Sequence, residues 1–205
     1  MSLPSVSVKH FASNYPSIAN CLPADWSGTA LDILSMTHCK AKARICVVTG
    51  FGFMSAKVLR LFAVDCAMHA LSKESIPDPR SLAACDVAKK FANNAATDEE
   101  LGVARKAARA AVTGSSFTLA EAAAAATAAA FSVAEKAALT ASLCAMEGAA
   151  DPATEYERQI TILKALLSTN TAATAPHQRK TAEAEFFFGK SSKGHDKEWW
   201  DKYAD

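Results

Sequence analysis

The fold is decided by residues 97–148, which read TDEELGVARKAARAAVTGSSFTLAEAAAAATAAAFSVAEKAALTASLCAMEG. Three times in this stretch a Ser or Thr is followed by Glu three residues later: Thr97 with Glu100, Thr118 with Glu121, and Ser132 with Glu135. In such a capping box, the hydroxyl and the carboxylate satisfy two free donors at the start of a helix. With Gly114 and Gly148 as stops, the boxes predict helices over 98–113, 119–131 and 133–147.

The composition of the whole chain agrees with a helical fold. Ala fills 45 of the 205 positions, with only 8 Gly and 7 Pro, and Ala is the strongest helix former. Half of the residues are hydrophobic and the mean hydropathy is +0.05, which excludes wholesale disorder. We therefore expect an all-α fold, a compact Ala-rich multi-helix bundle without strands.

Start signals place the remaining helices. Asp78-Pro79 and Asp151-Pro152 combine an N-cap carboxylate with a proline at the first helical position, which favours a helix start, and Ser55 is a further N-cap. The helices expected outside the capping boxes are 27–36, 40–49, 55–71, 78–93 and 151–168. The wide apolar surface of 55–71, which includes Phe62, predicts a central helix packed on two sides.

Composition shifts divide the chain into four parts. Pro4, Pro16 and Pro23 lie among Ser and Asn, so residues 1–26 are expected to form an irregular N-terminal arm. The helical domain spans 27–168. A Thr- and Ala-rich linker covers 169–176, and an aromatic and charged tail covers 177–205.

Charge and hydropathy exclude some classes of function. The chain has 22 Lys and Arg against 21 Asp and Glu, whereas proteins that coat nucleic acid carry a basic excess; nucleic acid is therefore not an expected partner. The most apolar run, Ile45–Met54, is shorter than the ~20 residues that a membrane span needs. No basic segment followed by an apolar one is found near Met1, so we expect a soluble, cytoplasmic protein.

The six cysteines are expected to be reduced and structural. Cys39, Cys46, Cys66, Cys85 and Cys144 lie in apolar, helix-like segments, where Cys behaves as a small hydrophobe, and only Cys21 lies in an irregular stretch. No C-x-x-C motif occurs. His38-Cys39 with Cys46 comes closest to a metal-ligand set, but adjacent helical residues point about 100° apart. No metal and no cofactor are expected.

No pattern predicts catalysis, and we expect a protein that is not an enzyme. Ser115 and Ser116 lack the strand–turn–helix setting of a nucleophile, and Gly189–Ser192 lacks the rest of a phosphate-binding loop. Asp65 and His69, at i and i+4, are expected to pair on one helix face, with a catalytic base as the alternative. Acidic residues 98–100 are expected to complement a helix dipole rather than bind a metal. The basic residues of 40–44 and 105–109 are expected to form solvated faces.

The tail is the candidate binding segment. Six aromatic residues stand within 18 positions: Phe186, Phe187, Phe188, Trp199, Trp200 and Tyr203. Exposed aromatic surface of this size is costly in water, so the tail is expected to dock on its own domain, on a second copy or on a partner. Because Trp199 and Trp200 are adjacent, one surface cannot easily receive both, and a bridging role is expected.

The stretch from Asp25 to about Leu167 resembles an Ala-rich helical family of bacteria and their phages whose members carry the label of immunity proteins. The resemblance rests on these segments: Asp25–Gly28, Leu61–Ala63, Asp65–Ala67, Asp78–Ser81, Ala96–Leu101 and Glu157–Gln159. It implies a helical fold and a role in immunity or phage counter-defence, and it brings no catalytic residues.

The leading hypothesis is a non-enzymatic protein that binds and occludes a toxin, a nuclease or another defence component. The alternative is a structural or assembly component of a phage or bacterial complex, in which the tail joins subunits into a homo-oligomer. A third class is a small enzyme or a nucleotide-binding module.

Overall fold

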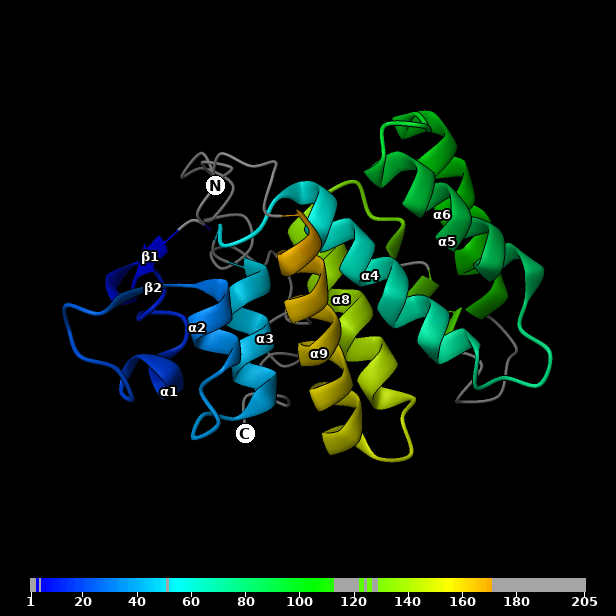
Figure 1. The fold of residues 1–205 in the computed structure, drawn as a ribbon. Helices are drawn as coiled ribbons and strands as arrows, with labels where there is room; N and C mark the ends of the chain where they lie inside the picture. Colours follow the sequence, from blue (N-terminus) through cyan, green and yellow to red (C-terminus); the bar gives the residue numbers. More distant parts are fainter. Residues whose placement is uncertain are drawn as a thin grey trace, which may run out of the picture.

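The computed structural model describes residues 3, 5–50, 52–112, 122–123, 125–126 and 129–170, and these residues are mostly helical (Figure 1). The elements, in chain order, are β1 (Ser5–Ser7), the 3-10 helix η1 (Val8–His10), α1 (Pro16–Ala19), β2 (Ser27–Thr29), α2 (Ala30–Leu34), α3 (Ala41–Gly50), α4 (Ala56–Leu71), α5 (Pro79–Ala92), α6 (Asp98–Val112), α8 (Ala134–Glu147) and α9 (Pro152–Asn170). The Ala-rich helical bundle predicted from the sequence is confirmed, and the expectation that it contains no strands is wrong, because β1 pairs with β2.

Helix α4 lies at the centre of the bundle and packs against α5, α8 and α9. Figure 1 shows α5 and α6 on one side of the molecule and α1, α2 and α3 on the other, with α4, α8 and α9 between them. Phe62 of α4 is fully buried. The central position predicted for this helix is confirmed.

Small side chains are prominent among the buried residues of α4 and α8, which pack against each other. Ala63 and Ala67 of α4 are fully buried, as are Ala137, Ala138 and Ala141 of α8. Helices with such faces approach toward the lower end of the usual spacing of about 8–10 Å. The alanines therefore set how closely the central helices pack.

Four of the predicted helix starts are confirmed by their caps. Ser55 accepts from the N–H of Val58 at 3.2 Å, and Asp78 accepts from the N–H of Arg80 at 2.8 Å. The Thr97–Glu100 box is complete, because the N–H of Thr97 donates to Glu100 at 2.7 Å and the N–H of Glu100 donates to Thr97 at 3.2 Å. Asp151 accepts from the N–H of Ala153 at 3.0 Å.

The capping box predicted at Ser132 is wrong. The N-cap of α8 is Val133, with no side-chain cap, so Ser132 lies one residue too early to reach the free N–H groups. The carbonyls of Phe131 and Ser132 instead accept from the guanidinium of Arg60, a buried residue of α4. The Thr118–Glu121 box lies outside the described residues.

A short sheet replaces the start of the helix predicted over 27–36. Strands β1 and β2 are antiparallel, with Val6 opposite Gly28. A Cβ on Gly28 would lie 2.3 Å from the Trp26 ring, so only glycine fits this approach. Helix α2 begins after Thr29, which forms a capping box with Asp32. Strands of three residues are too short to produce an alternating pattern, which is why the sequence analysis missed them.

The N-terminal segment expected to be an irregular arm carries β1, η1 and α1 and packs into the core. Phe11 and Ile18 are fully buried. The Phe11 ring lies 6.2 Å from Trp26 and 6.3 Å from Phe53, between ring centroids. Residues 5–29 therefore belong to the body of the domain.

The last described residues, Thr169 and Asn170, belong to α9. The rest of the linker at 169–176, and the tail at 177–205, lie outside the described residues. Among the helices that the structure describes, none is long and apolar enough to cross a membrane.

Candidate functional site

Four charged or titratable side chains meet where α4 packs against α9. Asp65 and His69 come from successive turns of α4, and Glu155 and Arg158 come from the first half of α9. Arg158 Nη1 lies 2.5 Å from Asp65 Oδ1, and His69 Nε2 lies 3.2 Å from Glu155 Oε2. The predicted Asp65–His69 pair is wrong, because each side chain instead faces a partner on α9 that one helix alone cannot reveal.

Glu155 is the buried centre of this cluster, with 2% of its side chain exposed. Its carboxylate accepts from Arg158 at 3.0 Å and from Gln159 Nε2 at 2.9 Å, and it lies beside the His69 ring. A buried carboxylate is tolerated when donors surround it in this way. The network continues into α8, since Ser142 Oγ donates to Gln159 Oε1 at 2.5 Å. Hydrogen bonds thus join α4, α8 and α9 through the core.

The surroundings keep His69 neutral. Burial lowers the pKa of His69, and the charge of Arg158 acts in the same direction, while Glu155 opposes both. The contact between His69 and Glu155 is therefore not an ion pair at neutral pH.

Arg158 is held in one position from two sides. Burial alone would lower its pKa, but the hydrogen bonds to Glu155 and Asp65 raise it. The guanidinium therefore stays charged. Its side chain is 22% exposed, so a held positive charge reaches the molecular surface.

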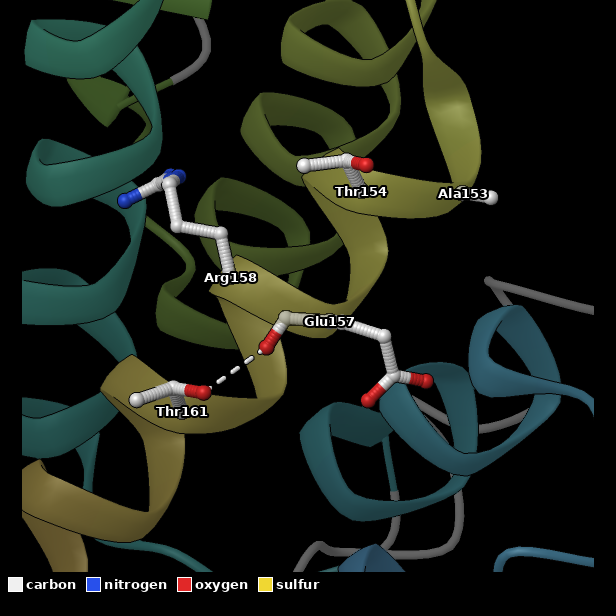
Figure 2. Close-up of a pocket in the computed structure, with 5 residues that line it drawn as sticks. All are labelled: Ala153, Thr154, Glu157, Arg158 and Thr161. Carbon is white, nitrogen blue, oxygen red and sulfur yellow. Dashed lines mark hydrogen bonds between the residues drawn. The ribbon is translucent and has the colours of Figure 1, made fainter.

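A hollow of about 500 Å³ opens on the outer face of α9. Figure 2 shows its lining residues, all from this helix: Ala153, Thr154, Glu157, Arg158 and Thr161. In this view the Arg158 side chain extends toward α4 and the Glu157 side chain toward α3. The hydroxyl of Thr161 donates to the Glu157 carbonyl at 2.9 Å. All the lining residues except Arg158 are exposed, so the hollow is shallow and open.

Glu157 is anchored to α3 through a buried arginine. Arg44 Nη2 lies 2.8 Å from Glu157 Oε1, and Arg44 Nη1 donates to the carbonyl of Leu34 at 2.8 Å. The expectation that the basic stretch 40–44 forms a solvated face is wrong for Arg44. One wall of the hollow is thus tied to α3 and the other to α4.

The basic stretch 105–109 also departs from expectation. The guanidinium of Arg105 lies 4.0 Å from the centre of the Phe131 ring, and Lys136 Nζ lies 4.9 Å from the same centre. Arg105 is therefore half-buried in a cation–π contact, while Lys106 and Arg109 are exposed as predicted.

Sequence reasoning missed Ser142, Glu155 and Gln159 as members of the network. A signal was present in α9, because Glu155 and Gln159 directly precede Tyr156 and Ile160 of the predicted apolar stripe. Polar residues beside such a stripe point partly into the core. Ser142, among alanines, gives no comparable signal.

The cysteines are placed mostly as predicted. Cys39, Cys46, Cys66 and Cys85 are buried and Cys144 is half-buried, and none of the six is in a disulfide. Burial raises the pKa of Cys46 to about 11 and that of Cys85 to about 12. The metal-ligand set considered from the sequence is different in the structure: Cys46 is buried on α3, and Cys21 approaches His38 and Cys39 instead.

The remaining predicted site residues lie outside the described residues. These are the tail aromatics Phe186, Phe187, Phe188, Trp199, Trp200 and Tyr203, together with Ser115, Ser116 and the segment 189–192. In comparisons with known proteins, no protein-family model, no curated protein and no solved structure matches this chain.

Proposed function

We propose that this chain acts without catalysis, by binding and occluding another protein in the cytoplasm of a bacterial or phage-infected cell. The partner is a toxin, a nuclease or another defence component, as expected for a protein of the immunity or counter-defence kind. The observation that supports this most is the open, charged hollow on α9, whose walls are held by ion pairs to α3 and α4.

The shape of the hollow favours a protein partner. Sites for small molecules bury about 70–90% or more of the ligand surface, whereas this hollow is lined by one face of one helix and most of its lining residues are exposed. A surface of this form receives side chains that protrude from another protein. Arg158 stands at its edge, and Arg is enriched among residues that carry binding energy.

The lining of the hollow carries one charge of each sign, Glu157 and Arg158. Glu157 is held by Arg44, and Arg158 is held by Asp65 and Glu155, so both charges have fixed positions. A partner surface with an acidic group opposite Arg158 and a basic group opposite Glu157 would complement this pair, and complementary charge guides association and suppresses wrong partners.

The aromatic tail supplies a second contact. Its six aromatic residues are of the types that anchor interfaces, at about 2 kcal/mol or more each when central. In this proposal the tail reaches the partner beyond the α9 face. A chain without residues 177–205 then keeps its helical fold and loses most of its affinity.

Site-specific crosslinking tests the proposal. A photoreactive phenylalanine analogue replaces Thr161 in the hollow, and a control carries it at exposed Ala110 of α6, a helix that packs on α5. In the native host, the full chain with the probe at position 161 should crosslink one protein that the control does not. That captured protein, once purified, should lose its activity in a one-to-one complex with this chain.

Two outcomes would contradict the proposal. Crosslinks to a second copy of this chain only would favour the assembly role instead. A captured protein that keeps full activity in the saturated complex would exclude occlusion.

A further inference from the structure

Three metal-ligand side chains converge where the N-terminal segment meets the turn before α3. Cys21 follows α1, and His38 and Cys39 lie between α2 and α3. The Sγ atoms of Cys21 and Cys39 and a ring nitrogen of His38 all lie within 4.8 Å of one another. None of these three residues lines the α9 hollow.

Local backbone structure explains why two adjacent residues can share one site. Adjacent helical side chains diverge by about 100°, but His38 and Cys39 lie in a turn, where the N–H of Cys39 donates to the carbonyl of Met36 at 3.1 Å. Cys21 is held by a similar turn, with its N–H on the carbonyl of Ile18 at 2.9 Å. Contacts between α1 and α3 bring the two turns together.

The spacing is close to that of a zinc site. With tetrahedral angles and Zn–S bonds of about 2.3 Å, the sulfur atoms of two zinc-bound thiolates lie about 3.8 Å apart. The ligand atoms of Cys21, His38 and Cys39 lie within 4.8 Å of one another, so they need to approach by about 1 Å at most. Cys39 is buried with 6% of its surface exposed, whereas Cys21 and His38 are exposed. Rotation of the two exposed side chains can close the remaining distance around the fixed Cys39.

The donor set selects the kind of ion. Two thiolates and one imidazole suit zinc and exclude the hard cations Mg²⁺ and Ca²⁺, which take oxygen ligands. Burial raises the pKa of the Cys39 thiol, and the neighbouring Cys21 adds to this. A bound divalent cation supplies the positive charge that stabilises both thiolates, with release of protons.

We propose that Cys21, His38 and Cys39 bind one zinc ion, with a fourth coordination position open to water. Such an ion joins the segment after α1 to the turn between α2 and α3, so it fastens the N-terminal elements to the helical body. The proposal is independent of the function proposed for α9.

Metal titration of the full chain tests the site. Under reducing, anaerobic conditions, the protein competes for zinc with a chromogenic chelator, and cobalt serves as a spectroscopic probe. We expect one zinc per chain, thiolate-to-cobalt charge-transfer bands with tetrahedral d–d bands, and a higher midpoint of thermal unfolding with zinc.

Variants at the exposed ligands make the test specific without disturbing the core. Cys21→Ser and His38→Gln should each weaken zinc binding by at least about 100-fold, since even outer-shell changes cost 10–100-fold. The control Cys144→Ser should bind as the wild type does. Equal zinc affinity in all four proteins, no zinc binding by the reduced chain, or a native Cys21–Cys39 disulfide seen as a 2 Da loss in intact mass would overturn the proposal.

Discussion

His69 of α4 and Glu155 of α9 face each other where the two helices pack, with 3.2 Å between Nε2 and Oε2. The carboxylate accepts from Arg158 and Gln159 on its own helix, and Arg158 donates to Asp65 of α4. The first two turns of α9 are therefore fixed to α4 by directional bonds, and the outer face of the same turns forms the hollow. The buried network and the proposed contact surface are two sides of one helix.

Removing the Glu155 carboxylate should destabilise the protein strongly. Glu155→Ala removes the acceptor of Arg158 Nε and Nη2 and one of the two acceptors of Gln159 Nε2, and breaking a buried charged pair costs about 3–5 kcal/mol. The control Asp86→Asn changes the ion pair with Lys90, in which both side chains are more than half exposed, and should cost less than about 1 kcal/mol. Urea unfolding measures both; equal losses would contradict the central role of Glu155.

Stability should fall as the pH is lowered from 7 to 5. Burial and Arg158 depress the pKa of His69 below its ordinary value, near ~6.5, so the unfolded chain binds the proton first. The stability that comes from keeping His69 neutral is present above about pH 6.5, and it is lost as the pH falls through the lower pKa of His69 in the folded state. The charge of Lys73 lowers the pKa of His69 as Arg158 does, whereas the charges of Glu155 and Asp65 raise it.

The variant His69→Gln keeps a polar side chain beside Glu155 but cannot titrate. Its unfolding free energy should depend less on pH between 5 and 7 than that of the wild type. A slope that is the same in wild type and His69→Gln would show that His69 does not titrate as described. Denaturant titrations at several pH values provide the measurement.

The core of α4 should depend on one aromatic side chain. Phe62 is fully buried, and Phe62→Ala should cost about 3–5 kcal/mol. Met68→Ala on the same helix removes a residue that is 43% exposed, and should cost about 1 kcal/mol or less. Chemical denaturation of the two variants tests this, and a loss under about 1 kcal/mol for Phe62→Ala would mean that the core is not built on α4.

Thr97 and Ser132 provide a matched test of helix capping. Thr97 forms a complete box with Glu100, so Thr97→Ala should lose about 1 kcal/mol. Ser132→Ala should be nearly neutral, because Ser132 makes no cap on α8. Thermal unfolding should thus give different losses of stability at two positions that look alike in the sequence. Equal losses would mean that Ser132 also caps a helix.

The helix starts could be predicted because a cap is local. Ser55, Asp78 and Asp151 act within three residues of their own positions, so the sequence alone contains the necessary information. The partners of Asp65 and His69 lie on α9, about 90 residues later, and depend on how α4 and α9 pack. The approach of Cys21 to His38 and Cys39 likewise depends on the docking of α1 against α3. Sequence patterns predicted the longer helices and missed the short elements of residues 5–29, while the candidate sites arise from contacts between elements.

The central claim is that the outer face of α9 blocks a partner protein, and activity titration tests it most directly. The partner captured from position 161 is titrated with the full chain and with the variants Thr161→Arg and Ala110→Arg, whose altered residues are both exposed. We predict complete inhibition at one equivalent by the wild type and by Ala110→Arg, and at least a tenfold weaker effect for Thr161→Arg. Equal inhibition by all three proteins would contradict the assignment of the α9 hollow as the binding surface.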